Sequence, residues 1–241
     1  MKVAALYDIH GNLPALDAVL GEVVAEGFDA IVVGGDACWG PWPAETVARL
    51  RDLGERALFV QGNTDREQFE LGGPRAATDA WVGARLDDEA RSFVAAWPLT
   101  RELEIEGLGR TCFCHATPRS DTEILTPLTP EAEIAEALLA TEAVVVVCGH
   151  THVQFDVPAG GRRLVNAGSV GFGYEGRPGA YWLELGPAIR HRRTEYDVES
   201  AAAAMAELDC PGGFEPSDLT DPPSADEAIA HFESMRAQAG Q

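Results

Sequence analysis

The chain predicts an α/β fold with parallel strands, and two observations carry that prediction. Short apolar runs, such as KVAALY at 2–7 and DAIVV at 29–33, have the length of buried strands. Between them lie segments in which apolar side chains recur every three to four positions, the spacing of an amphipathic helix. Strand, helix and strand in this order are typical of parallel strands joined by right-handed crossovers.

The N-terminal quarter contains five such elements. The helical spacing of apolar residues is clearest over 13–25, and Pro43 suits the first turn of a second helix. We expect, in order, strand 2–7, helix 13–25, strand 29–33, helix 43–53 and strand 57–60.

The middle of the chain has a weaker pattern. From 64 we expect a loop that leads to a helix at about 87–96. Alternating residues at 100–106 and the apolar run at 110–114 predict a hairpin. A helix at 130–141 and a strand at 143–148 follow. Four further short strands with Gly and Pro turns then predict an antiparallel sheet, and they lie at 153–157, 162–166, 179–185 and 188–195.

The C-terminal part predicts a helix at 198–207, a Pro-rich linker at 211–223 and a helix at 224–238. Too little chain follows the linker to form a separate domain. We therefore expect a single domain over 1–241, with its core at 1–196 and a C-terminal helical extension at 197–241.

Composition excludes several classes of protein. The 241 residues carry a formal net charge of −21, so there is no basic stripe for duplex nucleic acid. The acidity serves either solubility or internal carboxylates that meet bound cations. No apolar run has the length of a membrane span or of a signal peptide. Five irregularly spaced cysteines do not form a disulfide framework. We expect a cytoplasmic protein without a membrane partner.

Metal-binding residue types follow five of the expected strands, and these residues are the candidate site. The carboxyl ends of parallel strands are where ligands bind in open sheets, so we expect the side chains to converge. Four of the six histidines of the chain stand at these strand ends. The candidate metal ligands are Asp8, His10, Asp36, Asn63, His115, His150 and His152.

This set of residue types suits two divalent ions. Imidazole binds Mn, Fe, Co, Ni and Zn, and carboxylate oxygens suit the harder cations. Asp36 is the carboxylate best suited to bridge the two ions. A pair of ions about 3.5–4 Å apart binds both the attacking and the leaving oxygen of a phosphoryl displacement.

Each residue also has a structural explanation when it is taken alone. Asp8 and Asp36 suit helix caps, and Asn63 suits a turn. A lone histidine is more often a core residue than a ligand. The order and placement of all seven together favour the metal site.

The motifs resemble those of the calcineurin-like metallophosphoesterases, and most closely those of their small bacterial and archaeal phosphodiesterase branch. The similarity rests on DIHGN at 8–12, GGD at 34–36, GN at 62–63, His115 and GHTH at 149–152. NAGSVG at 166–171 is similar to a turn of the same branch.

This resemblance implies a four-layer α-β-β-α sandwich with two mixed β-sheets. It also implies ligand sets. The first metal would take Asp8, His10, Asp36 and His152, and the second would take Asp36, Asn63, His115 and His150. A hydroxide between the metals would attack phosphorus in line. Asp36, Asn63 and His115 are the expected catalytic residues.

One position departs from the family pattern. Much of the family has a histidine after the GN motif, where it is credited with protonating the leaving group or stabilising the transition state. This chain has Thr64, whose hydroxyl is too weak an acid for that role. The departure favours diester over monoester cleavage. Asp65 is expected to cap a helix or support a ligand.

Residues that contact substrate are harder to choose from the sequence. Trp39 and Trp42 suit stacking on a base or aryl group, or a packed turn. Arg66, Arg119 and Arg177 suit a phosphate oxygen, or a solvated surface. His191 and His231 are expected on the surface.

We expect a small phosphoester as substrate, a phosphodiester or nucleotide in particular. The alternatives are a phosphomonoesterase or nucleoside-polyphosphate hydrolase, and a non-catalytic scaffold of the same fold. A homo-oligomer is compatible with the sequence.

Overall fold

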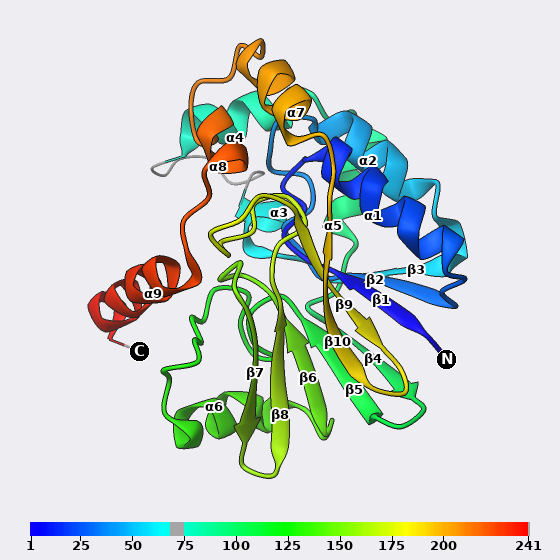
Figure 1. Cartoon of the computed structure of the whole chain (residues 1–241), viewed down its shortest axis with the longest axis vertical. Helices are drawn as coiled ribbons and strands as arrows, with labels where there is room; N and C mark the ends of the chain where they lie inside the picture. Colours follow the sequence, from blue (N-terminus) through cyan, green and yellow to red (C-terminus); the bar gives the residue numbers. More distant parts are fainter. Residues whose placement is uncertain (68–74, 241) are drawn as a thin grey trace.

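The computed structural model describes residues 1–67 and 75–240, and its strands there form two five-stranded mixed sheets (Figure 1). The first sheet has the order β10-β9-β1-β2-β3. Its members are β1 (Val3–Leu6), β2 (Ala30–Val33), β3 (Ala57–Phe59), β9 (Ala180–Leu185) and β10 (Ile189–Thr194). The first three strands pair in parallel, as their helical crossovers predict, and β9 joins β1 antiparallel.

The second sheet has the order β4-β5-β6-β8-β7. Its members are β4 (Thr100–Ile105), β5 (Gly109–Cys114), β6 (Val145–Cys148), β7 (Gln154–Ala159) and β8 (Arg162–Ala167). The central three are parallel, and the edge strands β4 and β7 close antiparallel hairpins.

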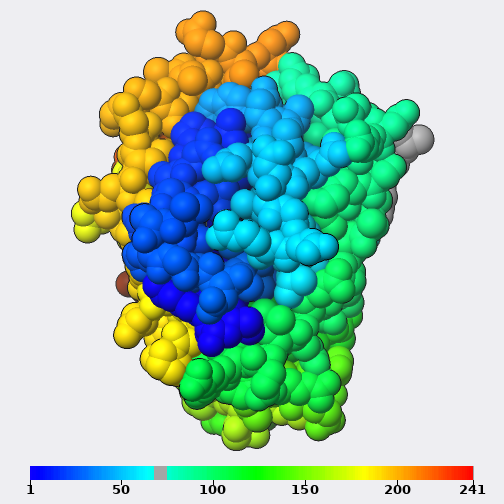
Figure 2. All heavy atoms as spheres, turned by 90° about the vertical axis from the view of Figure 1, so that its right-hand side faces the viewer, coloured from blue at the N-terminus to red at the C-terminus, as the bar shows by residue number. Residues whose placement is uncertain are grey.

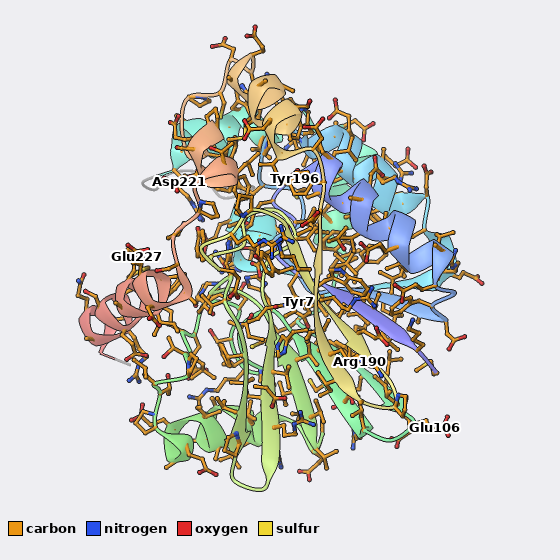
Figure 3. All side chains as sticks on the ribbon, viewed as in Figure 1. Tyr7, Glu106, Arg190, Tyr196, Asp221 and Glu227 are labelled. Atoms are coloured by element: carbon orange, nitrogen blue, oxygen red, sulfur yellow. The ribbon has the colours of Figure 1, made fainter. Side chains whose placement is uncertain are left out.

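The two sheets pack face to face, because side chains alternate along each strand. On β1, Val3 and Ala5 face the second sheet, where they share a buried cluster with Phe113 and Val147. Tyr7 continues this face, and its hydroxyl donates to the carbonyl of Val147 at 2.9 Å (Figure 3).

The outer faces of both sheets are covered by helices, which completes the predicted four layers. Alternate residues of β1, Ala4 and Leu6, pack toward the helices of the first sheet. These helices are α1 (Leu13–Ala25), α2 (Pro43–Arg51) and α5 (Asp88–Ala95), with a short 3-10 turn η1 (Gly54–Arg56). The second sheet is covered by α6 (Glu131–Ala137) and η2 (Leu138–Ala140). Figure 2 shows the residues of α1 and α2, coloured blue to cyan, on the face of the molecule that is on the right in Figure 1.

The antiparallel sheet predicted over 153–195 is wrong. The four strands form two hairpins that belong to different sheets, because β8 pairs with β6 and β9 pairs with β1. Local alternation of side chains identifies the hairpins, but the choice of partner strand depends on distant parts of the chain.

Two regions predicted as irregular contain short helices. The loop expected from 64 includes α3 (Asn63–Glu67) and α4 (Ala76–Gly83), and its residues 68–74 lie outside the described residues. The linker at 211–223 includes α8 (Pro216–Thr220). These helices are too short for a clear periodicity, and tertiary packing stabilises them.

The C-terminal extension packs onto the core through a cluster of its own. Met205 of α7 (Val198–Ala206), Phe214 and Leu219 are buried together with Val82 of α4 and with Trp39. Helix α9 (Ala225–Ala239) lies farther out (Figure 1). It is joined to the loop after β5 by Thr126, whose hydroxyl donates to Glu233 at 2.5 Å. No helix within the described ranges is long and apolar enough to cross a bilayer.

Candidate metal centre

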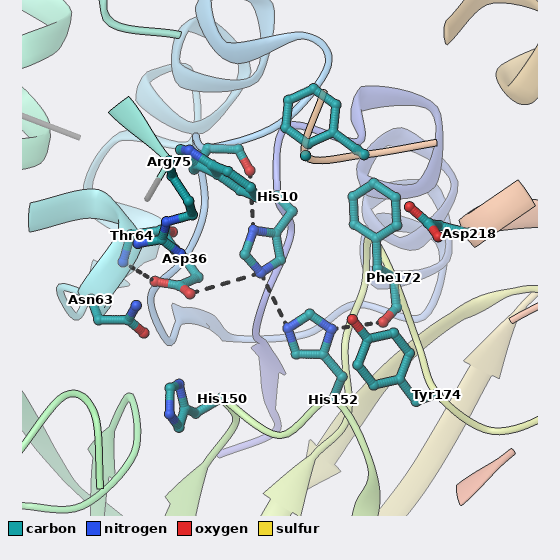
Figure 4. Close-up of a pocket in the computed structure, with 13 residues that line it drawn as sticks. His10, Asp36, Asn63, Thr64, Arg75, His150, His152, Phe172, Tyr174 and Asp218 are labelled. Atoms are coloured by element: carbon teal, nitrogen blue, oxygen red, sulfur yellow. Dashed lines mark hydrogen bonds and ion pairs between the residues drawn. The ribbon is translucent and has the colours of Figure 1, made fainter. Parts of the chain in front are cut away.

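The structure brings all seven predicted ligands together at the carboxyl ends of five strands. The loops after β1, β2 and β3 supply the residues of the first sheet, and the loops after β5 and β6 supply those of the second. Asp8 and His115 are fully buried. The other five line a pocket of about 230 Å³ (Figure 4), and they are His10, Asp36, Asn63, His150 and His152.

Five of the seven have a left-handed backbone. Asp8, His10, Asp36, His150 and His152 have φ between 46° and 69°, and within residues 1–67 and 75–240 no other non-glycine residue has a positive φ. This conformation is strained for a histidine. It turns neighbouring side chains of one loop toward the same point.

Hydrogen bonds between loops hold this strained backbone in place. The amide of Asp8 donates to Gly35 at 3.1 Å, and the amide of His10 donates to Asp36 at 2.8 Å. The NAGSVG turn supports the other side, where the Ser169 hydroxyl donates to the carbonyl of Asp8 at 2.7 Å and Asn166 donates to Gly149 at 2.6 Å.

Each carboxylate has one oxygen fixed by a backbone amide. Oδ2 of Asp8 accepts from the amide of His150 at 2.9 Å, and Oδ1 of Asp36 accepts from the amide of Thr64 at 2.8 Å. The second oxygen of each faces histidines. Oδ1 of Asp8 lies 3.4 Å from Nε2 of His152, and Oδ2 of Asp36 lies 3.4 Å from Nε2 of His115.

Three imidazoles are oriented by backbone carbonyls. Nδ1 of His10 lies 3.0 Å from the carbonyl of Trp39, Nδ1 of His115 lies 3.1 Å from that of Gly34, and Nδ1 of His152 lies 2.8 Å from that of Phe172. An Nδ1–H that donates to a carbonyl leaves Nε2 as the ligand atom. The Nε2 atoms of His10 and His152 are only 3.2 Å apart, so these two candidate ligand atoms converge.

Unpaired buried atoms show that the residues fit divalent ions. Oδ1 of Asp8, Oδ1 of Asn63 and Nε2 of His115 are buried and have no hydrogen-bond partner among the described residues. Unpaired buried polar atoms are rare in proteins, and a bound cation would satisfy these three. Two groups have ligand atoms within 4.8 Å of one another, namely Asp8, His10 and His152, and Asp8, Asp36 and His115.

The charges of the carboxylates and imidazoles are strongly coupled. Burial alone would raise the pKa of Asp36 and Asp8, but the facing histidines outweigh it and lower both. Burial would lower the pKa of His115, but Asp36 outweighs it and raises that pKa. His10 and His150 have their pKa lowered to about 4, mainly by burial. The cluster therefore carries both negative and positive charge before a metal binds.

Comparison with known proteins identifies the family. The model of the calcineurin-like phosphoesterase superfamily domain matches residues 1–185. The chain belongs to the calcineurin-like phosphoesterase superfamily. It is a metallophosphoesterase, a hydrolase of phosphoric esters, as its motifs predict.

Two relatives of this calcineurin-like phosphoesterase match it over most of their length. Uncharacterized protein MJ0912 of Methanocaldococcus jannaschii is 30% identical over 83% of this chain and 89% of its own length. A metallophosphoesterase from Sphaerobacter thermophilus has a TM-score of 0.71 and 27% identity over 88% of this chain and 95% of that chain.

Phosphodiesterase YfcE of Escherichia coli is 32% identical over 80 residues, which are 30% of this chain and 44% of YfcE. Its structure covers 77% of this chain and 88% of that chain, with a TM-score of 0.52 and 25% identity. These relatives place the chain in the small bacterial and archaeal branch that its motifs resemble.

The residues predicted to contact substrate are only partly in the pocket. Trp39 lines it, whereas Trp42 packs beside the cluster of the C-terminal extension. The three predicted arginines do not line it. They pair instead with carboxylates elsewhere: Arg66 with Asp121, Arg119 with Glu123 and Arg177 with Glu195. His191 and His231 are exposed, as predicted.

Several pocket residues were missed by the sequence analysis. Arg75 is the only Lys or Arg among the described residues that line the pocket. Phe172, Tyr174, Phe214 and Asp218 line it as well. Phe172 and Tyr174 directly follow the NAGSVG motif, which was the available signal for them. Nothing local in the sequence marks the other three.

Replacing Gly149 by alanine is expected to disrupt the centre. The added Cβ would lie 2.3 Å from Oδ2 of Asp8 and 2.7 Å from Cδ1 of Tyr7. We expect a loss of about 1–3 kcal/mol in the free energy of unfolding together with loss of bound metal. Gly21→Ala is the matched control, because that Cβ meets nothing within 4 Å on helix α1 and should stabilise by roughly 0.5–1 kcal/mol. If Gly149→Ala keeps the metal content and the stability of the wild type, the close approach of residue 149 to Asp8 and Tyr7 does not limit the site.

Metal binding is expected to release protons near neutral pH. The raised pKa of His115 and of His152 keeps both imidazoles protonated in the metal-free protein, and a ligand nitrogen must be deprotonated. Calorimetric titration with Mn²⁺ or Zn²⁺ at about pH 7, in two buffers of different ionisation enthalpy, should show about one to two protons released. Affinity should rise with pH. A binding heat that is the same in both buffers would contradict the predicted release of protons on metal binding.

Proposed function

We propose that the protein is a metal-dependent phosphodiesterase that cleaves a small phosphodiester. The observation that carries the proposal is a pocket lined by five of the seven converging metal-binding side chains, in which Arg75 is the one Lys or Arg among the described residues. At Thr64 this pocket has no group suited to protonate a poor leaving group. The acidic chain also favours a compact substrate with little negative charge.

The proposed ligand sets follow the two sides of the cluster. The first proposed ligand set consists of Asp8, His10, Asp36 and His152. The second consists of Asp36, Asn63, His115 and His150. Asp36 is common to both sets and lies between them. Two divalent ions held there would supply the positive charge that activates water and stabilises the phosphoryl oxygens. We propose Asp36, Asn63 and His115 as the residues on which the reaction depends most.

Thr64 supports the site through its backbone and supplies no acid. Its amide fixes one oxygen of Asp36, and its side chain is buried, with a hydroxyl that has no partner among the described residues. A hydroxyl of ordinary pKa does not protonate a departing alkoxide. Diesters with a good leaving group need no such proton, which favours them over alkyl monoesters.

Arg75 is proposed to hold a non-bridging phosphate oxygen. Its guanidinium lies over the ring of Trp39, 5.1 Å from the centroid, and pairs with Glu67. Figure 4 shows it on the same side of His10 as Asn63 and Thr64. A planar guanidinium supported on both sides is well suited to bind phosphate.

Hydrolysis by metal-loaded protein tests the reaction. Bis-p-nitrophenyl phosphate should be cleaved at least about tenfold more efficiently than p-nitrophenyl phosphate. Both esters lose the same p-nitrophenolate, but the diester carries one negative charge where the monoester carries about two, which the acidic chain disfavours. His115→Ala and Asn63→Ala should each lose metal and reduce kcat by about 100-fold or more. The exposed His231→Ala is the control. Preference for the monoester would favour the phosphatase alternative, and full activity in both variants would refute the two-metal assignment.

Substitution of Arg75 tests the phosphate contact. Arg75→Gln should lower kcat/KM for bis-p-nitrophenyl phosphate by about 10–100-fold with metal content unchanged, because it removes a charge-assisted contact. Arg177→Gln removes an exposed arginine that pairs with Glu195 outside the pocket and should retain full activity. If the two variants behave alike, Arg75 does not bind phosphate.

A further inference from the structure

The outer part of the pocket, beyond the candidate metal ligands, has a composition of its own. Its walls are the aromatic side chains of Trp39, Phe172, Tyr174 and Phe214, with the carboxylate of Asp218 beside them. We name these five residues the outer cage. Phe214 and Asp218 come from the C-terminal extension, which lies beyond the segment that the family model matches.

Two ring contacts of the outer cage are steep, and a third is stacked. Trp39 and Phe214 lie 5.1 Å apart with their planes at 79°, and Phe172 meets the ring of His10 at 64°. Tyr174 stacks on His152 at 4.7 Å, so one of its faces is already covered. A flat base or aryl ring is held best where an open ring face lies parallel to it. Rings that face a space from different directions suit a rounded group instead.

Asp218 gives this space a negative end. Its Oδ2 accepts from the amide of Glu215 at 2.8 Å in the capping box of α8, which fixes the carboxylate. In Figure 4, Asp218 lies beside Phe172, and Arg75 lies on the opposite side of His10. The pocket is therefore positive at the proposed phosphate end and negative at the outer end. A second phosphate group would be repelled there.

We propose that the outer cage binds a cationic ammonium group on an alcohol of the scissile phosphodiester. An ammonium ion is attracted to the faces of aromatic rings and to the nearby carboxylate, and a quaternary one is enclosed best by several rings. Such a substrate is a zwitterion whose two charges match the two ends of the pocket. This inference rests on the proposed phosphodiesterase activity. It adds that one of the two alcohols esterified to the phosphate carries an ammonium group.

Two substrates that differ only in charge test the outer cage. p-Nitrophenyl phosphorylcholine and the p-nitrophenyl diester of 3,3-dimethylbutanol have the same leaving group and nearly the same shape, but only the first carries an ammonium group. With metal-loaded full-length protein, kcat/KM for the choline ester should exceed that for the isostere with an uncharged alcohol group by about tenfold. The difference should lie mainly in KM.

Variants identify the source of that preference. Asp218→Asn keeps an oxygen that can accept from Glu215 and should reduce the ratio of the two kcat/KM values by about fivefold or more. Phe214→Leu should reduce it in the same direction. Asp221→Asn is the control, because it removes one charge from the exposed end of α8 (Figure 3) outside the pocket, and the ratio should stay at the wild-type value.

Three results would overturn the proposal. The first is equal kcat/KM for the choline ester and its dimethylbutyl isostere in the wild type. The second is an unchanged ratio in Asp218→Asn when this variant keeps the wild-type thermal stability. The third is a preference for thymidine 5′-p-nitrophenyl phosphate over the choline ester. Each is read on protein that cleaves bis-p-nitrophenyl phosphate. Protein that binds metal and cleaves no diester would instead refute the proposed function.

Discussion

The position of Asp8 is the constraint on which the rest of the site depends. Its amide is bound to the loop after β2, its carbonyl accepts from Ser169, and its carboxylate accepts from the amide of His150 in the loop after β6. One residue thus ties together loops from both sheets. The second carboxylate oxygen is buried at their junction and has no hydrogen-bond partner among the described residues.

Much of the site was predictable from the sequence because each candidate ligand directly follows a strand. Parallel strands bring their carboxyl ends to one edge, so Asp8 and Asp36 converge without knowledge of any distant contact. His115 and His150 follow strands of the other sheet, and the family resemblance supplied that division. The hairpins at the C-terminal side of the core were recognised, but their partner strands were not. The reason is that β8 pairs with β6 and β9 pairs with β1, and both partners lie well before these strands in the sequence.

The outer part of the pocket was not predictable for a different reason. Arg75 precedes a short helix without clear periodicity, and Phe214 and Asp218 lie in a segment that reads as a linker. Their place at the pocket follows from the packing of α4, α7 and α8 on Trp39. The three arginines that did seem suitable have acidic partners elsewhere. Sequence proximity to a motif is thus a reliable guide to ligands fixed by a strand, and a poor guide to residues carried by later segments.

The left-handed backbone at five candidate ligands has a consequence for how the centre forms. The free energy of folding includes the cost of this strained backbone, because hydrogen bonds between protein groups fix the loops. An ion that enters would meet side chains already in position and would lose little affinity to reorganisation. The site is in this sense preorganised at the expense of global stability. Protein engineering that relaxed these loops would be expected to yield a more stable fold and a weaker metal site.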